Sequence, residues 1–210
     1  PNGRPFRYHD SQREAIETLI YVYEVAKIRR HKDLLEKYAP SLASLRLLQY
    51  DDFARYCIKM ATGSGKTKVM SLAGAWQYFN AVAEGRDDYA KTFLVIAPNV
   101  IVFERLRTDF AGGRIFRIER GGDPVIPPEL KIFWDMECYI RGDAERAGSQ
   151  GALYLTNVQQ FYERTDRTQE DEPEEMTAVL GPKPPSKQIE VEDFDKRIAA
   201  RGNATMIIND

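Results

Sequence analysis

Cysteine and histidine are scarce in this sequence, which has only two of each among 210 residues. Cys57 and Cys138 are too few for a disulfide framework. Neither a CxxC nor an HxxxH spacing is present to bind zinc. We therefore expect a chain that works in a reducing, cytoplasmic compartment and folds without disulfides or structural zinc.

Long apolar runs are also missing. No segment approaches the roughly 20 residues that span a bilayer, and the first residues, PNGRPFRYHD, lack the hydrophobic segment of a signal peptide. We expect no membrane association. Because the sequence starts at Pro1 without a methionine, we also expect it to be a piece of a longer protein.

An excess of charge of either sign is absent as well, since 30 Lys and Arg stand against 32 Asp and Glu. A net charge of −2 excludes a uniformly basic, histone-like nucleic-acid binder. This net charge is, however, the sum of two regions of opposite charge. Residues 164–195 hold four basic and ten acidic side chains, which leaves 26 basic against 22 acidic elsewhere. The acidic, proline-rich residues 165–187 predict a disordered loop, and the mildly basic remainder is compatible with nucleic-acid binding.

Strand patterns alternate with helix patterns along the chain. We expect strands over residues 56–60, 92–97, 115–118, 152–156 and 204–208, and helices over 11–30, 66–83, 100–110, 157–164 and 190–201. This alternation predicts an α/β fold with a mostly parallel sheet and helices on both faces. Residues 31–52 form helical stretches broken at Pro40, and they predict a helical insertion.

The segment MATGSGKT, residues 60–67, is the strongest chemical signal in the sequence. It stands between a strand pattern and a helix pattern, which is the context that a phosphate-binding loop requires. Gly63 and Gly65 let backbone N–H groups turn toward phosphate oxygens, next to the positive end of the following helix. Lys66 can reach the β and γ phosphates of a nucleotide, and the Thr67 hydroxyl can bind Mg²⁺.

This segment resembles motif I of the superfamily-two DEAD/DEAH-box helicases and translocases. It is most similar to the motor subunits of type III or type I restriction enzymes, where methionine is common at the position of Met60, a glycine in the general pattern. The resemblance implies that residues 1–210 are an N-terminal RecA-like P-loop NTPase lobe, with ATP and Mg²⁺ as cofactors. The ATP-binding residues that it implies are Tyr8, Gln12, Thr62, Gly63, Ser64, Gly65, Lys66 and Thr67.

Gln12 lies in the segment RPFRYHDSQREAI, which resembles the adenine-recognising segment that precedes motif I. Its amide carries a donor and an acceptor, and these can pair with N7 and N6 of adenine. Phe6, Arg7 or Tyr8 can cover the face of the ring. The alternative is that Gln12 is an exposed residue in the first turn of a helix and that Tyr8 belongs to the core.

Two strand ends resemble motifs that contact a nucleic-acid backbone in these motors. FLVIAPN with the following helix is similar to motif Ia, and YLTNVQQFYE is similar to a threonine-containing motif. For the arginines the alternative is a solvated helix face, and for Asn157 it is a helix cap. The implied contacts are Pro98, Asn99, Arg105 or Arg107, Thr156, Asn157 and Gln159.

The final residues, TMIIND, resemble the opening of motif II, the DExH box. This implies that Asp210 holds Mg²⁺ through water and is catalytic together with Lys66 and Thr67. It also implies that the lobe is cut within motif II. The glutamate that polarises the attacking water, and a second RecA-like lobe with its arginine finger, would follow in the parent protein.

These resemblances imply the ATP-binding lobe of an ATP-dependent DNA translocase or helicase of the restriction-modification type. The implied partners are the DNA backbone, the second lobe, and nuclease and methyltransferase or specificity parts of the parent. Three alternatives stay open: an RNA helicase lobe, a P-loop small-molecule NTPase or kinase, and a non-catalytic nucleic-acid-binding module. A P-loop kinase would share Gly65, Lys66 and Thr67 but would have no reason to carry Gln12.

Overall fold

The computed structural model describes residues 7–42, 53–117, 125–140, 143–146, 148–159 and 194–210. The chain divides into two compact units, Pro1–Leu72 and Ala73–Asp210. The boundary falls within helix α3, Lys66–Val82. The acidic loop expected at 165–187 lies outside the described residues.

The first unit is helical in its described N-terminal part. Helix α1, Asp10–Ile20, continues into a π-helical turn, Tyr21–Val25. It ends earlier than the predicted residue 30, because the backbone of Lys27 is left-handed with a φ of 53°. Helix α2, His31–Tyr38, is followed by a 3₁₀ turn, Pro40–Leu42. Helical structure with a break at Pro40 is therefore observed over residues 31–42 of the expected insertion, and residues 43–52 lie outside the described part.

Two of the predicted strands are wrong. Residues 54–60 have no regular secondary structure and join no strand ladder among the described residues. An apolar run indicates burial or extension, but a strand exists only where a second strand pairs with it. The second strand was predicted over residues 115–118. There the chain forms a 3₁₀ segment, Ala111–Phe116, and residue 118 lies outside the described part. Gly112 and Gly113 have positive φ angles of 61° and 73° there, which turn the chain sharply.

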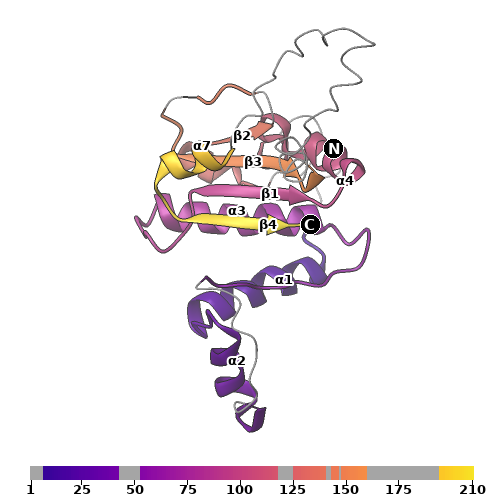
Figure 1. The fold of residues 1–210 in the computed structure, drawn as a ribbon, viewed down its shortest axis with the longest axis vertical. Helices are drawn as coiled ribbons and strands as arrows, with labels where there is room; N and C mark the ends of the chain where they lie inside the picture. Colours follow the sequence, from indigo (N-terminus) through magenta and orange to yellow (C-terminus); the bar gives the residue numbers. More distant parts are fainter. Residues whose placement is uncertain (1–6, 43–52, 118–124, 141–142, 147, 160–193) are drawn as a thin grey trace, which may run out of the picture. The chain divides into compact units, whose positions relative to one another are not determined.

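The second unit contains a parallel four-stranded sheet (Figure 1). Its strands are β1 (Thr92–Ala97), β2 (Met136–Ile140), β3 (Gly151–Asn157) and β4 (Thr205–Asn209), in the order β2-β3-β1-β4. In the register, Leu94 of β1 lies opposite Tyr154 of β3 and Ile207 of β4. The mostly parallel α/β sheet predicted from the sequence is therefore confirmed, while β2 was not predicted.

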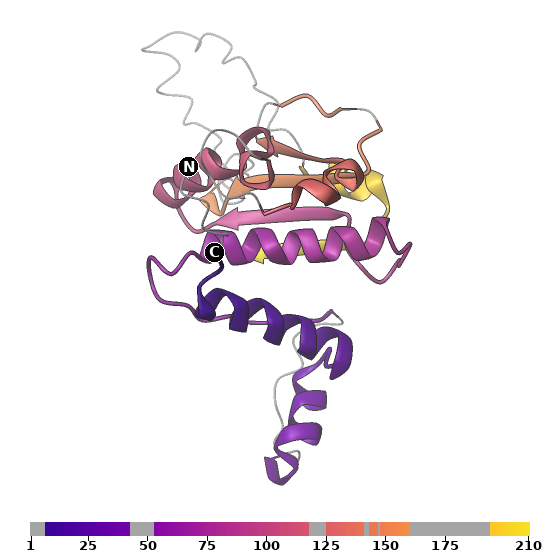
Figure 2. The same cartoon turned by 180° about the vertical axis from the view of Figure 1, so that it is seen from behind.

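One face of this sheet is covered by the second half of α3 and by α4, Val100–Phe110 (Figure 2). Phe93 and Val95 of β1 point into this layer and are fully buried. An aromatic cluster closes it: Phe116 lies 4.8 Å from Trp134 and 6.0 Å from Phe110, measured between ring centroids. This apolar and aromatic layer favours the folded state mainly by removing apolar surface area from water.

The opposite face is covered by α7, Phe194–Arg201 (Figure 1). Tyr154 stacks on Tyr139 at 5.5 Å and packs against Phe194 at 5.1 Å, again between ring centroids. The predicted helices on both faces of the sheet are therefore observed. Among the described helices, none combines the length and apolar character needed to cross a membrane.

A charged network fixes α7 to this face. The Glu145 carboxylate accepts hydrogen bonds from Arg197, Arg201 and the Tyr154 hydroxyl, each at 2.9 Å. Burial acts to raise the pKa of Glu145, but the hydrogen bonds from its three partners outweigh it, so the pKa lies below its usual value. Arg201 also donates to the carbonyl and hydroxyl oxygens of Ser149, at 3.2 and 2.8 Å. Because the donors of Arg201 are occupied within the protein, we assign this network to holding α7 on the sheet and not to binding a ligand.

The two cysteines are expected to differ sharply in reactivity. Cys138 on β2 is buried, and burial, with a further contribution from the charge of Glu137, raises its pKa to about 12. Cys57 is exposed. Since the thiolate is the reactive form, a thiol reagent at pH 8 should modify one cysteine of the native protein quickly and the other only after unfolding. A Cys57→Ser variant should show no fast reaction. Two fast thiols in the native protein would contradict this assignment.

Candidate nucleotide-binding site

The loop before α3 has the backbone conformation of an anion-binding nest. Gly63 and Gly65 have φ angles of 79° and 83°, while Ser64 between them is not left-handed. The Ser64 amide and hydroxyl both donate to the carbonyl of Ala61, at 3.3 and 2.7 Å, which closes the turn. Alternating handedness of this kind directs successive N–H groups to one side of the chain. The loop is therefore shaped to hold an anion.

The space and charge around this loop also suit a phosphate group. A Cβ added at Gly63 would meet no atom within 4 Å. The amides of Lys68 and Val69 donate to the carbonyl of Gly65, at 2.9 and 3.3 Å, so the first turn of α3 starts from the loop itself. The first N–H groups of a helix have no partner within it. Within the described residues, the Lys66 ammonium makes no hydrogen bond or ion pair. A polyphosphate fits these donors.

Gln12 connects the start of α1 to this loop. Its Oε1 accepts from the His9 amide at 3.1 Å, and its Nε2 donates to the Ser64 carbonyl at 3.2 Å. Gln12 is 6% exposed, so it is not the exposed first-turn residue of the alternative interpretation. A Cβ added at Gly65 would overlap Gln12 Nε2. One amide hydrogen and one lone pair of Gln12 remain for adenine, whose recognition by Gln12 and Tyr8 stays a prediction.

Thr62 and Thr67 stand on either side of the glycines. Thr62 is exposed, and Thr67, in the first turn of α3, is half-buried. The Thr67 carbonyl accepts from the Ser71 hydroxyl at 2.8 Å, as a continuing helix allows. The Thr67 hydroxyl is an oxygen donor of the type that Mg²⁺ prefers. In the part of the chain that the structure describes, no three His, Cys, Asp or Glu side chains form a metal site. Bound Mg²⁺ would therefore need further oxygen ligands, which water molecules and phosphates provide.

Asp210 follows β4 at the carboxyl end of the sheet in the second unit. Its amide donates to the carbonyl of Ile96 at 3.2 Å, which continues the pairing of β4 with β1. Its side chain is only 8% exposed, and Arg105 Nη2 donates to its Oδ2 at 3.2 Å. A carboxylate is a suitable Mg²⁺ ligand. The structure thus joins a predicted metal ligand to a predicted nucleic-acid contact, a pairing that no sequence signal indicates.

The remaining candidates on α4 have different local roles. Pro98 is exposed. Asn99 is the N-cap of α4, and its Oδ1 accepts from the Val102 amide at 2.9 Å. Arg107 pairs with Glu104 of the same helix at 3.1 Å, in agreement with the solvated-face interpretation. Among the described residues, Arg105 pairs with Asp210, outside its own helix, whereas Arg107 pairs with Glu104 within it.

Thr156 and Asn157, at the end of β3, are 2% and 6% exposed. Both lie within the strand, and the amide of the next residue, Val158, donates to the Ala97 carbonyl at 2.9 Å. The described structure gives these side chains almost no free surface. Their contact with a nucleic-acid backbone stays a prediction. The helix expected over 157–164 lies mostly outside the described residues.

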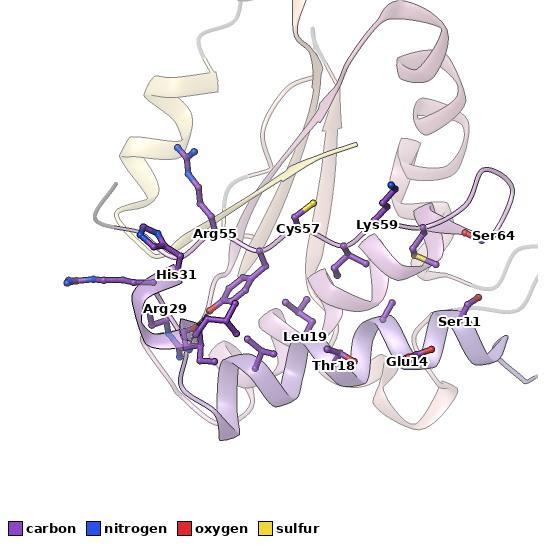
Figure 3. A pocket seen from close by; sticks show the side chains of 18 of the residues that line it. Ser11, Glu14, Thr18, Leu19, Arg29, His31, Arg55, Cys57, Lys59 and Ser64 are labelled. Atoms are coloured by element: carbon purple, nitrogen blue, oxygen red, sulfur yellow. Dashed lines mark hydrogen bonds between the residues drawn. The ribbon is translucent and has the colours of Figure 1, made fainter. Parts of the chain in front are cut away.

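A groove of about 710 Å³ runs along α1 in the first unit (Figure 3). Residues 55–61 form its other wall, and Ser64 of the loop stands at one end. Figure 3 shows Arg55, Cys57 and Lys59 on the side of this segment that faces away from α1. The Tyr56 hydroxyl donates to the Ile28 carbonyl at 2.5 Å, and burial raises the pKa of Tyr56. The groove is lined by both apolar and polar side chains.

Comparison with known protein families identifies a matching family. The model of the family described as type III restriction enzyme, res subunit, matches residues 6–181. The domain of that family is helicase-like and RecA-like, and the parallel sheet of the second unit agrees with it. Domains of this kind generally bind ATP. No curated protein and no solved structure matches the chain.

Proposed function

Since the chain belongs to the family of type III restriction enzyme res subunits, we propose that it is the ATP-binding lobe of an ATP-dependent DNA translocase. The observation that carries the proposal is the loop of residues 61–65 at the start of α3. It combines two left-handed glycines with the ammonium of Lys66, which is unpaired among the described residues. These features together recognise polyphosphate.

In the proposed reaction the residues of this chain supply position and charge. Lys66 and the N–H groups of the loop and of α3 hold the phosphates and stabilise the negative charge that develops during transfer. The Thr67 hydroxyl and the Asp210 carboxylate are the candidate Mg²⁺ ligands, and the metal would neutralise part of the phosphate charge. Gln12 holds the loop through the Ser64 carbonyl and recognises adenine with its remaining donor and acceptor.

The nucleic acid in this proposal is DNA, held through its backbone. Pro98 and Asn99 are exposed and follow directly after β1, where open parallel sheets bind ligands. Contacts to phosphate position a protein on the duplex without reading its sequence, as a translocase requires. The choice of DNA over RNA comes from the family, because no described residue distinguishes a 2′-hydroxyl. Stepping would further require the second lobe, and the nuclease and modification subunits would be partners of the whole enzyme.

Nucleotide binding tests the proposal directly. We expect the 210-residue chain to bind a fluorescent ATP analogue weakly, and we expect Lys66→Ala to weaken binding at least about tenfold, since it removes the ammonium group that directly follows the loop. Lys59→Ala is the control, because Lys59 is exposed and points away from α1. Hydrolysis by the chain alone should be negligible. Equal affinities of the wild-type and Lys66→Ala proteins, or hydrolysis that persists in the variant, would refute the assignment.

A second arm separates a DNA translocase from a small-molecule NTPase. ATP hydrolysis by a longer protein that contains this lobe is measured with and without DNA and with RNA. Stimulation by DNA supports the proposal. Equal rates under all conditions favour the P-loop kinase or NTPase alternative, and stimulation by RNA alone favours an RNA helicase.

A further inference from the structure

The ion pair between Arg105 and Asp210 joins two elements of the second unit. Arg105 lies on α4 and Asp210 follows β4, and their contact is 3.2 Å between Nη2 and Oδ2. The exposures of the two side chains are very different, at 58% for Arg105 and 8% for Asp210. The carboxylate is thus nearly buried, while most of the arginine side chain faces solvent.

A nearly buried carboxylate needs a positive partner, because water no longer solvates its charge. Among the described residues, the cation that pairs with Asp210 is Arg105. A divalent metal ion is another cation that carboxylate oxygens bind. A guanidinium group and a metal ion at one carboxylate repel each other at short range. The two cations therefore compete for Asp210.

We propose that Arg105 is a positioning residue that exchanges between the Asp210 carboxylate and a nucleic-acid phosphate, according to whether a divalent cation occupies Asp210. Without the metal, Arg105 neutralises Asp210. With the metal bound, the guanidinium is displaced and becomes available to the backbone. The inference rests on the proposed function, which assigns Mg²⁺ to Asp210 and nucleic acid to the edge where α4 begins.

The properties of Arg105 suit this exchange. Its guanidinium already reaches solvent, and a planar guanidinium binds phosphate through two parallel hydrogen bonds. Arg107, two residues further along α4, pairs instead with Glu104 of its own helix in the described part of the chain. Coupling between two binding events is reciprocal. The metal ion should therefore strengthen DNA binding by the same factor by which DNA strengthens metal binding.

The first test uses Mn²⁺ and Mg²⁺ alone, without nucleotide, on the 210-residue chain. Mn²⁺ affinity is measured by electron paramagnetic resonance for the wild type, Arg105→Ala, Arg107→Ala and Asp210→Asn. Removing the competing guanidinium should tighten Mn²⁺ binding about two- to fivefold in Arg105→Ala, the size expected for one ion pair whose arginine is largely exposed. Arg107→Ala should bind as the wild type does, and Asp210→Asn should lose the side-chain-dependent site. If Arg105→Ala proves unstable, Arg105→Gln replaces it.

A second readout follows the arginine itself. The NMR signal of the Arg105 Nε–H group, assigned by its loss in Arg105→Lys, should shift when Mg²⁺ is added, and the Arg107 signal should not. At constant ionic strength, Mg²⁺ should also raise affinity for a short DNA duplex more in Arg107→Ala than in Arg105→Ala.

An Arg105 signal unmoved by saturating Mg²⁺, or Mn²⁺ affinity that is unchanged or weaker in Arg105→Ala, would overturn the inference. These outcomes are independent of the test of the proposed function, because ATP binding and its dependence on Lys66 are measured separately. If Arg105 does not respond to the metal but ATP binding is intact, the exchange of Arg105 is refuted and the proposed ATP-binding function stands. If Arg105 responds to the metal but ATP binding does not depend on Lys66, the proposed nucleotide site is refuted instead.

Discussion

Gly151→Ala is expected to destabilise the second unit by about 1–3 kcal/mol, the usual cost of overpacking a core. Gly151 is the buried first residue of β3. An added Cβ would lie 2.7 and 2.9 Å from two ring carbons of Tyr78 and 3.2 Å from the Lys91 carbonyl oxygen. The first two distances are too short for carbon atoms, so the ring or the strand must shift.

Tyr78 has little freedom to give way. It is fully buried, its hydroxyl donates to the Phe133 carbonyl at 3.3 Å, and the same hydroxyl accepts from the Asp135 amide at 2.9 Å. Its ring also packs on Trp134, 4.8 Å away between centroids. Moving the ring would break these contacts. The methyl group therefore clashes with a fixed side chain rather than with a flexible one.

Gly74→Ala is the matched control, with the opposite expected sign. Gly74 lies within α3, and its added Cβ would be 4.0 Å from the ring of Phe93, which is ordinary contact. Alanine should then stabilise the helix by roughly 0.5–1 kcal/mol relative to glycine. Urea unfolding measures both variants. If Gly151→Ala unfolds at the same urea concentration as the wild type, the packing of Tyr78 against β3 is not as described.

Two of the strands that the sequence predicts correctly, β1 and β3, are buried almost without interruption. β3 is buried at every residue, and β1 is buried at every residue except Ile96. Their segments TFLVIA and GALYLTN are therefore almost wholly apolar, as strands covered on both faces must be. β2 has no such run, because Glu137 stands within MECYI and forms an ion pair with Arg146 at 2.9 Å. This polar residue interrupts the apolar pattern that would otherwise predict a strand.

Pairing between distant segments is what the sequence does not reveal. The apolar run at 56–60 predicts a strand, yet local hydrophobicity cannot specify a partner strand, and among the described residues none pairs with it. The glycine-rich loop is recognisable because its functional residues are adjacent in the chain. Two other contacts join segments that are far apart in the sequence: Gln12 with Ser64, and Arg105 with Asp210. No local pattern predicts them, and only the folded structure reveals them.

Gly65→Ala is expected to weaken binding of an ATP analogue more than any other single change to the glycines of the loop. Gly65 has a φ of 83°, which costs a residue with a side chain about 1–2 kcal/mol. In addition, its new Cβ would overlap Gln12 Nε2, so either the Gln12–Ser64 hydrogen bond breaks or the loop moves. Both effects disturb the N–H groups that hold phosphate, and we expect a loss of at least about tenfold in affinity.

Gly63→Ala separates the two contributions to this loss. Its φ of 79° imposes a similar backbone cost, but its Cβ would meet no atom within 4 Å. The difference between the two variants therefore measures the clash with Gln12. If the clash is real, adding Gln12→Ala to Gly65→Ala should cost much less than Gln12→Ala does in the wild type, because coupled residues are not additive. The cycle consists of the wild type, Gln12→Ala, Gly65→Ala and the double variant, and fluorescence titration measures the affinity of each for the ATP analogue. Strictly additive losses of affinity would show that Gln12 does not hold the loop.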